Sequence, residues 1–496
     1  MAPSLKDSSL FRQQCFVSGR WINASDGHTM AVTNPADGTI LGTVPVMGAT
    51  DIREVVTGAE AAYIPWRQRT AKERALVLRR WHDLILANLS DLSTLMTLEQ
   101  GKPLAESRGE IAYAASFIEW FAEEAKRIYG DVVPTTLAGN RIVVLKEPVG
   151  VCAAITPWNF PAAMITRKAG PALAAGCTMI AKPAGQTPFT ALALAALAER
   201  AGVPKGVFNV VTGDSAVIGK ELTRHPTIRK LSFTGSTAVG KQLMRDCAAT
   251  VKKISIELGG NAPLIVFDDA DCDAAVAGGI ASKYRNTGQT CVCANRILVQ
   301  DGIYDQFVRA FSAAVQDLRV GPGLDDGIEH GPLIDANVLE KVEELIEDAL
   351  ANGAQVLVGG ARHALGGTFF QPTVLAEVIA SMRVANEEIF GPVAPIVRFS
   401  TEKDAIQMAN DTPYGLAAYV YTRDVGRVWR VSEAIEYGIV GINTGIISTE
   451  VAPFGGMKES GIGREGSRYG IDEYLEVKYV CMSGIDPRTF HERGYP

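Results

Sequence analysis

With 496 residues the chain is too long for a single hydrophobic core, and its length predicts two or three domains. A net charge of −7 argues against nucleic acid or an anionic membrane as the main partner. No apolar run approaches the roughly 18 residues that cross a bilayer, and the N-terminal stretch MAPSLKDSSLFRQQC lacks the apolar core of a signal peptide. We therefore expect a cytoplasmic protein without a membrane partner.

The cysteine and histidine patterns predict no metal site. Six of the eight cysteines are scattered, mostly among apolar residues or alanines, which is typical of buried, reduced thiols. The other two, Cys291 and Cys293, are too close together for a zinc-ribbon pair. The six histidines are dispersed and form no HExxH motif.

The region before residue 130 is predicted to be mostly helical. One of its segments, TAKERALVLRRWHDLILANL, opens with a capping box between Thr70 and Glu73. Two later segments, RIVVLKEP (141–148) and EYLEVKYVCM (473–482), alternate like exposed strands and have no obvious helix partner.

From residue 149 onward, short runs rich in valine and isoleucine alternate with helical segments, which is the pattern of parallel βαβ units. The helix after the second strand has clear end signals: Thr187 as N-cap, Pro188 at the first position and Gly202 after the last. A second alternating series begins near residue 263 and runs to about 445. The first series comprises five predicted strands, at 149–156, 178–182, 207–211, 228–233 and 252–258.

Two thiols lie one residue apart in GQTCVCANR (288–296), between a predicted helix at 271–286 and a strand at 296–300. A thiol in such a turn can be accessible to solvent. A free thiol has a pKa of about 8.5, however, and needs help to act as a nucleophile at neutral pH. A lone cysteine near glycine is more often structural, so this segment alone does not define a site.

Two strand ends supply groups that would assist a thiol. Glu257 ends a strand just before Gly259 and Gly260, and a carboxylate there faces the crevice in which parallel sheets bind ligands. Asn159, in ITPWNFPAAM, offers an amide that donates to a developing oxyanion, a contribution of roughly 3 kcal/mol. Taken singly, each residue also has a plainer interpretation, as a surface glutamate or as a turn-forming asparagine.

A phosphate-binding turn is predicted at FTGSTAVGK (233–241). It links a strand to a helix through Gly235 and Gly240, with Ser236 at the helix start, where backbone N–H groups and the helix dipole hold phosphate. The dinucleotide fingerprint GxGxxG occurs elsewhere, as GIGREG (461–466), but no strand precedes it and no βαβ unit surrounds it. We interpret that copy as a loop.

These segments stand with AKPA, EEIFGP and PFGGMKESGIGRE in the order and spacing of the aldehyde dehydrogenase superfamily. The chain resembles this family over nearly its whole length. It looks most similar to the succinate-semialdehyde dehydrogenases, through YRNTGQTCVCANR and ITRKAGPALAAGCT. The resemblance implies oxidation of a small acidic aldehyde, succinate semialdehyde, to succinate with reduction of a nicotinamide cofactor.

The resemblance assigns the chemical steps to three residues. Cys291 would attack the aldehyde carbon, and Asn159 together with the backbone N–H of Cys291 would hold the oxyanion. After hydride transfer to the nicotinamide, Glu257 would activate the water that hydrolyses the thioester. The presence of Glu257 favours water over coenzyme A as the acyl acceptor.

The resemblance also implies which residues bind the cofactor. Gly185 occupies a position at which many NAD-preferring members carry an acidic residue. Without a carboxylate there, nothing repels a 2′-phosphate, so we expect NADP to be accepted and preferred over NAD. The expected cofactor-binding residues are Trp158, Lys182, Ala184, Gly185, Gly235, Ser236, Leu258, Glu388 and Phe390.

For the substrate, Arg167, Arg285 and Ser448 match residues that grip the distal carboxylate of succinate semialdehyde in similar proteins. Guanidinium groups suit this role because each binds a carboxylate through two parallel hydrogen bonds. Each arginine taken alone also fits a surface helix. Glutarate semialdehyde, or a broader range of aldehydes, stays open as an alternative, since one methylene is worth only about 1–3 kcal/mol.

Two further alternatives stay open. Cys293 is either a packing residue or the redox partner of Cys291 in a strained, reversible disulfide. A cysteine hydrolase of the amidase kind would use similar residue types without a nucleotide, but it leaves FTGSTAVGK and Glu388 unexplained.

The expected fold class is α/β, the aldehyde dehydrogenase fold. It combines a Rossmann-like cofactor domain, an α/β catalytic domain that carries the nucleophile, and a small β flap for oligomerisation. We expect the NAD(P)-binding domain at 1–133 and 155–262, the catalytic domain at 263–445, and the flap at 134–154 and 470–490. Unpaired strand edges in the flap favour a homo-oligomer, either a tetramer or a dimer.

Overall fold

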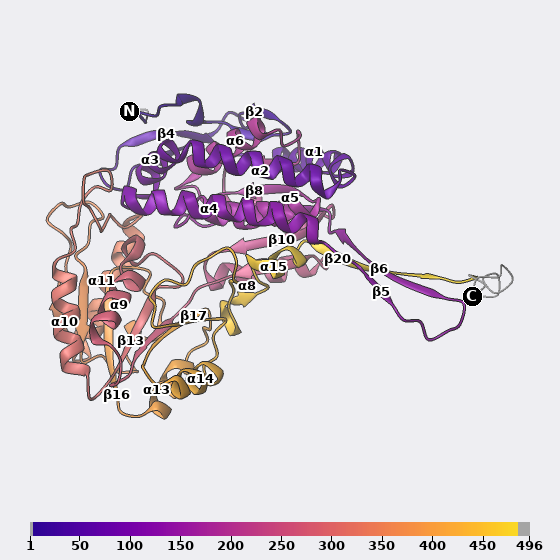
Figure 1. Ribbon diagram of the computed structural model, residues 1–496. Helices are drawn as coiled ribbons and strands as arrows, with labels where there is room; N and C mark the ends of the chain where they lie inside the picture. Colours follow the sequence, from indigo (N-terminus) through magenta and orange to yellow (C-terminus); the bar gives the residue numbers. More distant parts are fainter. Residues whose placement is uncertain (1–2, 485–496) are drawn as a thin grey trace.

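The computed structural model describes residues 3–484, which form two large, mainly parallel sheets flanked by helices (Figure 1). This arrangement confirms the expected α/β class. No helix among the described residues is long and apolar enough to span a bilayer. The helices are α1 (Ala49–Arg67), α2 (Ala71–Ala87), α3 (Leu89–Gln100), α4 (Leu104–Glu124), α5 (Ala163–Ala175), α6 (Pro188–Ala201), α7 (Ser215–Arg224), α8 (Thr237–Ala248), α9 (Cys272–Lys283), α10 (Tyr304–Gln316), α11 (Ala336–Ala351), α12 (Arg383–Asn386), α13 (Glu402–Asn410), α14 (Val425–Ala434) and α15 (Ser467–Asp472).

The first large sheet is doubly wound. In spatial order its strands are β19 (Gly461–Ile462), β11 (Lys253–Glu257), β10 (Ile228–Thr234), β7 (Val151–Ile155), β8 (Thr178–Lys182), β9 (Phe208–Val210), β1 (Cys15–Val17) and β2 (Arg20–Ile22). The five strands predicted between residues 149 and 258 are all present, as β7 to β11, and they are parallel. The chain runs outward from β7 through β8 and β9, then returns to β10 on the other side of β7. The switch point between β7 and β10 is where such sheets bind ligands.

The second large sheet follows the first in the chain. Its strands, in spatial order, are β14 (Gln355–Val358), β15 (Thr373–Ala376), β16 (Val393–Phe399), β13 (Ala294–Gln300), β12 (Ala262–Val266), β17 (Ala417–Tyr421) and β18 (Ile439–Ile442). All pairings are parallel except that of β14 with β15. The strands β12, β13 and β16 are almost wholly buried, which explains their continuous apolar runs.

Helices α1 to α4 make up more than half of the first 130 residues, as the sequence predicts. The capping box of α2 is confirmed, since Thr70 and Glu73 accept from each other's backbone N–H. Four strands precede the first helix, however: β1, β2, β3 (Thr29–Thr33) and β4 (Ile40–Pro45). They are only 3–6 residues long, with β1 buried and the other three partly exposed, so they carry little periodic signal. Ser18 and Gly19, both at positive φ, make the tight turn between β1 and β2.

Helix α6 begins and ends where the sequence predicts, but a distant residue caps it. Pro188 is its first residue, and Gly202 follows it in the left-handed conformation. The hydroxyl of Thr187 makes no capping bond. Instead the buried carboxylate of Glu99, on α3, accepts from the N–H groups of Phe189 and Thr190 at 2.7 and 2.8 Å. Local sequence cannot reveal a cap that comes from another helix.

The two exposed strands predicted outside both series pair with each other. β6 (Arg141–Pro148) lies between β5 (Asp131–Val133) and β20 (Leu475–Met482), and the three antiparallel strands project from the body as an arm (Figure 1). The strands of this arm do not match the expected flap of 134–154 and 470–490. β5 ends before residue 134, and β7 belongs to the first large sheet. Residues 485–490 of the expected flap lie outside the described part of the chain.

Candidate active site

The candidate site lies where the two large sheets face each other. The loops after β7 and β10 leave the carboxyl ends of their strands, while the loops before β13 and β16 lead into the amino ends of theirs. Strand β11 ends at Glu257, and the connection from β11 to β12, which crosses between the sheets, carries Gly259 and Gly260. Segments far apart in the sequence therefore meet at one crevice.

A cavity of about 250 Å³ at this place, here called the thiol cavity, brings together most of the expected catalytic and cofactor-binding residues. Lys182, Ala184, Gly185 and Glu257 are not among its lining residues. The lining comprises Pro157, Trp158, Asn159, Thr234, Gly235, Ser236, Leu258, Gly259, Cys291, Val338, Lys341, Glu388 and Phe390.

Glycines after Glu257 allow three loops to approach closely. A Cβ on Gly260 would lie 2.4 Å from the carbonyl oxygen of Cys291, and one on Gly259 would lie 2.7 Å from Oε2 of Glu388. The N–H of Gly260 donates to Oε1 of Glu388 at 2.9 Å. Any larger residue at these positions would push the thiol loop and the Glu388 loop apart.

The loop that carries Cys291 follows an irregular turn at the end of α9. Helix α9 ends at Lys283, earlier than predicted, because Asn286 and Thr287 adopt left-handed backbone conformations with φ of 51° and 57°. The half-buried thiol of Cys291 has its pKa raised to about 12, first by burial and then by the negative charge of Glu388, with Arg167 opposing. The thiol is thus protonated at neutral pH in the free enzyme, and a base must remove its proton.

Asn159 is fixed with one amide hydrogen free for a ligand. Its Nδ2 donates to the carbonyl of Gln289 at 3.0 Å, which occupies one of its two hydrogens. Its backbone carbonyl accepts from Nζ of the buried Lys102 at 2.7 Å and from Nδ2 of Asn286 at 3.0 Å. This geometry holds the side chain beside Cys291 and suits an oxyanion donor.

Glu257 is buried behind the thiol cavity, where its Oε2 has no hydrogen-bond partner within residues 3–484. Its pKa is raised well above the usual range, first by burial and then by the charge of Glu465, while Arg167 and Lys168 oppose the shift. Glu465 pairs with both cations: its Oε2 lies 2.8 Å from Nε of Arg167, and its Oε1 accepts from Lys168. A carboxylate with a raised pKa is a stronger base than an ordinary one, which suits it to take a proton.

Of the three residues expected to bind the carboxylate of the substrate, two line one cavity and the third does not. Arg285 and Ser448 line a second cavity of about 510 Å³, here called the arginine cavity, together with Tyr113 and Phe160. The guanidinium carbon of Arg285 lies 4.9 Å from the ring centroid of Phe160, and no carboxylate of the described residues pairs with it. Arg167 is almost fully buried, pairs with Glu465 and does not line this cavity.

The segment after β7 connects the two cavities. Pro157, Trp158 and Asn159 line the thiol cavity, and the next residue, Phe160, lines the arginine cavity. The two cavities therefore lie on either side of one short segment.

The remaining cofactor positions suit a dinucleotide. Ser236 caps α8, and the hydroxyl of Thr237 in its first turn is buried without a partner in the described chain, as a pyrophosphate site requires. Glu388, whose pKa burial raises to about 7, and Phe390, whose ring meets Trp158 edge-on at 5.4 Å, lie at the other end. These groups fit a nicotinamide dinucleotide.

Lys182 has a hydroxyl as a hydrogen-bond partner, and Asp214 is the acidic residue whose charge acts on it. Nζ of Lys182 donates to Oγ of Ser215 at 2.7 Å, and burial lowers the pKa of this lysine to about 8. A Cβ on Gly185 would lie 2.7 Å from Cε of Met30. Met30 therefore covers the place where an acidic side chain would stand.

Both thiols of the CVC sequence are free. The buried Sγ of Cys293 donates to the carbonyl of Lys283 at 3.5 Å, and no disulfide joins it to Cys291. Across residues 3–484 no cluster of three or more His, Cys, Asp and Glu side chains could hold a metal ion.

Several polar residues of the site carried no prediction, among them Tyr113, Lys168, Thr237 and Glu465. Lys168 follows Arg167 directly, and Glu465 lies in GIGREG, which forms a loop containing the two-residue strand β19. The only available signal for Glu465 was its place in a glycine-rich sequence, since its partners lie almost 300 residues away.

Comparison with known proteins agrees with this geometry. The model of the Aldehyde dehydrogenase family matches residues 21–480, so the chain belongs to that family and is an NAD(P)-dependent oxidoreductase. It is 64% identical to the succinate-semialdehyde dehydrogenase [NADP(+)] GabD of Escherichia coli, over 96% of this chain and 99% of that protein. It is 63% identical to a glutarate-semialdehyde dehydrogenase of Pseudomonas aeruginosa, over 97% and 100%.

A solved structure gives the same result. The crystal structure of an E. coli NADP-dependent enzyme superposes with a TM-score of 0.96 at 63% identity and covers 97% of this chain and 100% of that one. The expected fold, family and enzyme class are confirmed.

Proposed function

We propose that the protein oxidises succinate semialdehyde to succinate and reduces NADP⁺. The observation that carries the proposal is the guanidinium of Arg285, which has no ion-pair partner among the described residues. It lines the arginine cavity, which is separated from the thiol cavity by the segment after β7. An unpaired guanidinium attracts a carboxylate at the far end of a short aldehyde. The names of the E. coli and P. aeruginosa relatives support a semialdehyde of a dicarboxylic acid.

The residues would act in the following order. Cys291 transfers its proton to a solvent water and attacks the aldehyde carbon as a thiolate, and Asn159 donates a hydrogen bond through its free amide hydrogen to the resulting oxyanion. A bound nicotinamide supplies the hydride acceptor. Glu257 then takes a proton from the water that hydrolyses the thioester on Cys291, and its raised pKa suits that transfer.

Preference for NADP⁺ is supported by the contacts of Lys182. No acidic side chain stands at Gly185, Met30 covers that position, and Lys182 with Ser215 offers a cation and a hydroxyl to a 2′-phosphate. The E. coli relative is named as an NADP(+) enzyme.

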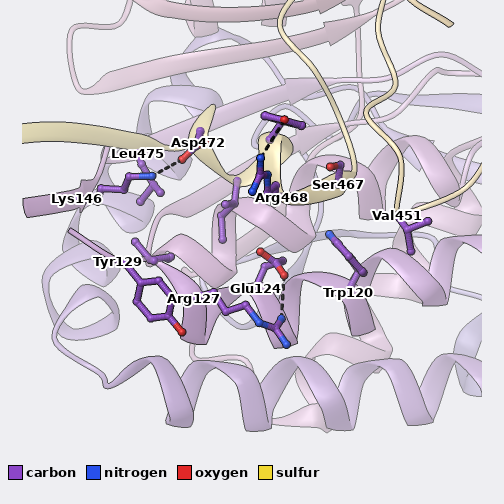
Figure 2. A pocket seen from close by; sticks show the side chains of 13 residues that line it. Trp120, Glu124, Arg127, Tyr129, Lys146, Val451, Ser467, Arg468, Asp472 and Leu475 are labelled. Atoms are coloured by element: carbon purple, nitrogen blue, oxygen red, sulfur yellow. Dashed lines mark hydrogen bonds and ion pairs between the residues drawn. The ribbon is translucent and has the colours of Figure 1, made fainter. Parts of the chain in front are cut away.

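We further propose a cytoplasmic homo-oligomer, a tetramer or a dimer. All eight cysteines are free, as a reducing compartment favours, although Cys481 on β20 is exposed rather than buried. The arm exposes apolar side chains, among them Val132 and Tyr479, 80% and 64% exposed. A cavity of about 620 Å³ lies at its base, and Figure 2 shows Trp120, Tyr129 and Arg468 among the side chains that line it. Exposed edge strands and apolar residues beside a cavity favour a second copy of the chain as partner.

The test is a set of steady-state kinetics with succinate semialdehyde, glutarate semialdehyde and butyraldehyde, each with NADP⁺ and NAD⁺. We expect the highest kcat/KM with succinate semialdehyde and NADP⁺. Higher efficiency with the longer semialdehyde would transfer the proposal to glutarate semialdehyde. Equal efficiency for butyraldehyde would contradict an acidic substrate, and hydrolytic activity without nucleotide would indicate the amidase alternative.

A further inference from the structure

Besides the guanidinium of Arg285, the arginine cavity is lined by a tyrosine whose hydroxyl has no acceptor. We infer that the hydroxyl of Tyr113 donates a hydrogen bond to the distal acid group of the substrate and thereby selects acidic over neutral aldehydes. This inference rests on the proposed function and adds a substrate-binding residue to it.

Tyr113 is held rigidly at the wall of the cavity. It lies on α4, and its ring meets that of Phe117, one helical turn later, edge-on with centroids 4.8 Å apart and an interplanar angle of 69°. Its backbone carbonyl also accepts from Oγ of Ser116 at 2.8 Å. A side chain fixed in this way loses little further freedom when it binds a ligand.

The buried hydroxyl of Tyr113 has no hydrogen-bond partner among residues 3–484. Other buried tyrosines of the site region do have acceptors: Tyr419 donates to the carbonyl of Val292 at 2.7 Å and Tyr284 to that of Thr373 at 2.8 Å. A buried donor without an acceptor is costly, and such groups in folded proteins call for an explanation. An acid group bound in the cavity supplies the missing acceptor.

The arginine cavity is also lined by Lys102 and by three glutamates, Glu106, Glu110 and Glu329. Each glutamate already has a partner: Glu110 pairs with Lys102, Glu106 accepts from the N–H of Asn286, and Glu329 pairs with Arg319, so Arg285 is left to attract an anion. The guanidinium carbon of Arg167 lies 5.7 Å from the ring of Phe117, the ring that Tyr113 also packs against, and Nη2 of Arg167 is likewise buried without a partner in the described chain. Burial raises the pKa of Tyr113, although Arg167 and Arg285 oppose the shift and Glu465 and Glu450 add to it. The hydroxyl therefore keeps its proton at neutral pH and acts as a donor.

The two groups have different effects on a substrate. Arg285 attracts any anion, whereas the hydroxyl of Tyr113 stabilises only a ligand that places an acceptor oxygen within hydrogen-bond distance of it. A neutral aldehyde that ends in a methyl group leaves both donors without an acceptor, so it binds less tightly than its acidic counterpart.

The experiment compares Tyr113→Phe with the unmodified holoenzyme on succinate semialdehyde and butyraldehyde, which have the same chain length. We expect KM for the acidic aldehyde to rise roughly tenfold, as loss of a hydrogen bond to a charged group predicts, with kcat and both constants for butyraldehyde little changed. The inhibition constant of succinate should rise by the same factor, which gives a second measure of acid binding. The variant should fold normally, because the hydroxyl that it removes has no partner in the free enzyme.

Tyr421→Phe is the matched control. The hydroxyl of Tyr421 is also buried and unpartnered within the described residues, but Tyr421 lines neither cavity, so its loss should change no constant. An unchanged ratio of the two KM values in Tyr113→Phe would overturn the inference and leave the proposed function intact. Absence of any preference for the acidic aldehyde in the unmodified enzyme would overturn both.

Discussion

The thiol cavity and the arginine cavity differ in the elements that line them. Strand-end loops and the start of α11 build most of the thiol cavity, and its polar groups Glu388 and Asn159 already have protein partners. Helix α4 and the residues around Arg285 build much of the arginine cavity, where Tyr113 and Arg285 have no partner in the described chain.

The difference indicates two ways of preparing a site. Contacts within the protein already hold the polar groups of the thiol cavity, so they need little rearrangement when the reaction begins. In the arginine cavity the donor groups of Tyr113 and Arg285 form no hydrogen bond with the described residues, and a bound ligand would supply their acceptors. Reactivity is therefore expected to depend on the first cavity and substrate choice on the second.

The largest effect is expected from a change of the nucleophile in the thiol cavity. Cys291→Ser should lower the rate of aldehyde oxidation by about 10⁴-fold, because the serine hydroxyl is a far weaker nucleophile, while the affinity for NADP⁺ stays unchanged. The measurements are NADPH absorbance and cofactor binding by fluorescence. Cys481→Ser, at an exposed position on β20, is the control. Oxidation at an undiminished rate in Cys291→Ser would remove the thiol from the mechanism.

The next effect concerns the arginine cavity alone. Arg285→Gln should raise KM for succinate semialdehyde about 100-fold, because a charged pair of hydrogen bonds is lost, and should change KM for butyraldehyde much less. Arg309→Gln, which alters an exposed arginine of α10, serves as the control. An equal rise for both aldehydes would show that Arg285 supports the structure rather than the substrate.

A smaller effect concerns cofactor binding outside both cavities. Since the pKa of Lys182 is lowered to about 8, this lysine is charged below pH 8 and loses its charge above it. The dissociation constant of NADP⁺ should therefore rise by about tenfold between pH 7 and pH 9, whereas that of NAD⁺, which lacks the 2′-phosphate, changes little. Isothermal titration at three pH values measures this, and parallel changes for the two cofactors would refute the role of Lys182.

The smallest effect concerns the second thiol. If Cys293 is a redox partner, mild peroxide should inactivate the enzyme and dithiothreitol should restore it, whereas the activity of Cys293→Ala should not be restored. Sγ of Cys293 must leave the carbonyl of Lys283 to form such a bond. Equal, reversible sensitivity in the variant would favour the packing role.

The sequence predicts the thiol cavity better than the arginine cavity for a physical reason. Short apolar runs predict parallel strands from the sequence. The residues at the carboxyl ends of such strands must lie along one edge of the sheet, which predicts that Asn159, Gly235 and Glu257 lie close together. Tyr113 lies inside a helix whose periodicity reports only which face is buried. Its unpaired hydroxyl depends on packing between segments that no local pattern records.

The same limit applies to Arg167. Its type and position suggest a carboxylate grip, but the structure pairs it with Glu465, 298 residues further along the chain. The strands β1 to β4 were not predicted because segments of only 3–6 residues carry no reliable period.

The central claim is that Cys291 forms a covalent acyl intermediate which Glu257 helps water to release. The most direct measurement mixes Glu257→Gln holoenzyme, saturated with NADP⁺, with succinate semialdehyde and follows NADPH and peptide masses together. The claim predicts a burst of about one NADPH per subunit, then turnover slowed by at least about 100-fold, with a succinyl group on the peptide that carries Cys291. Steady NADPH production at the unmodified rate, or an acyl group on any other residue, would contradict it.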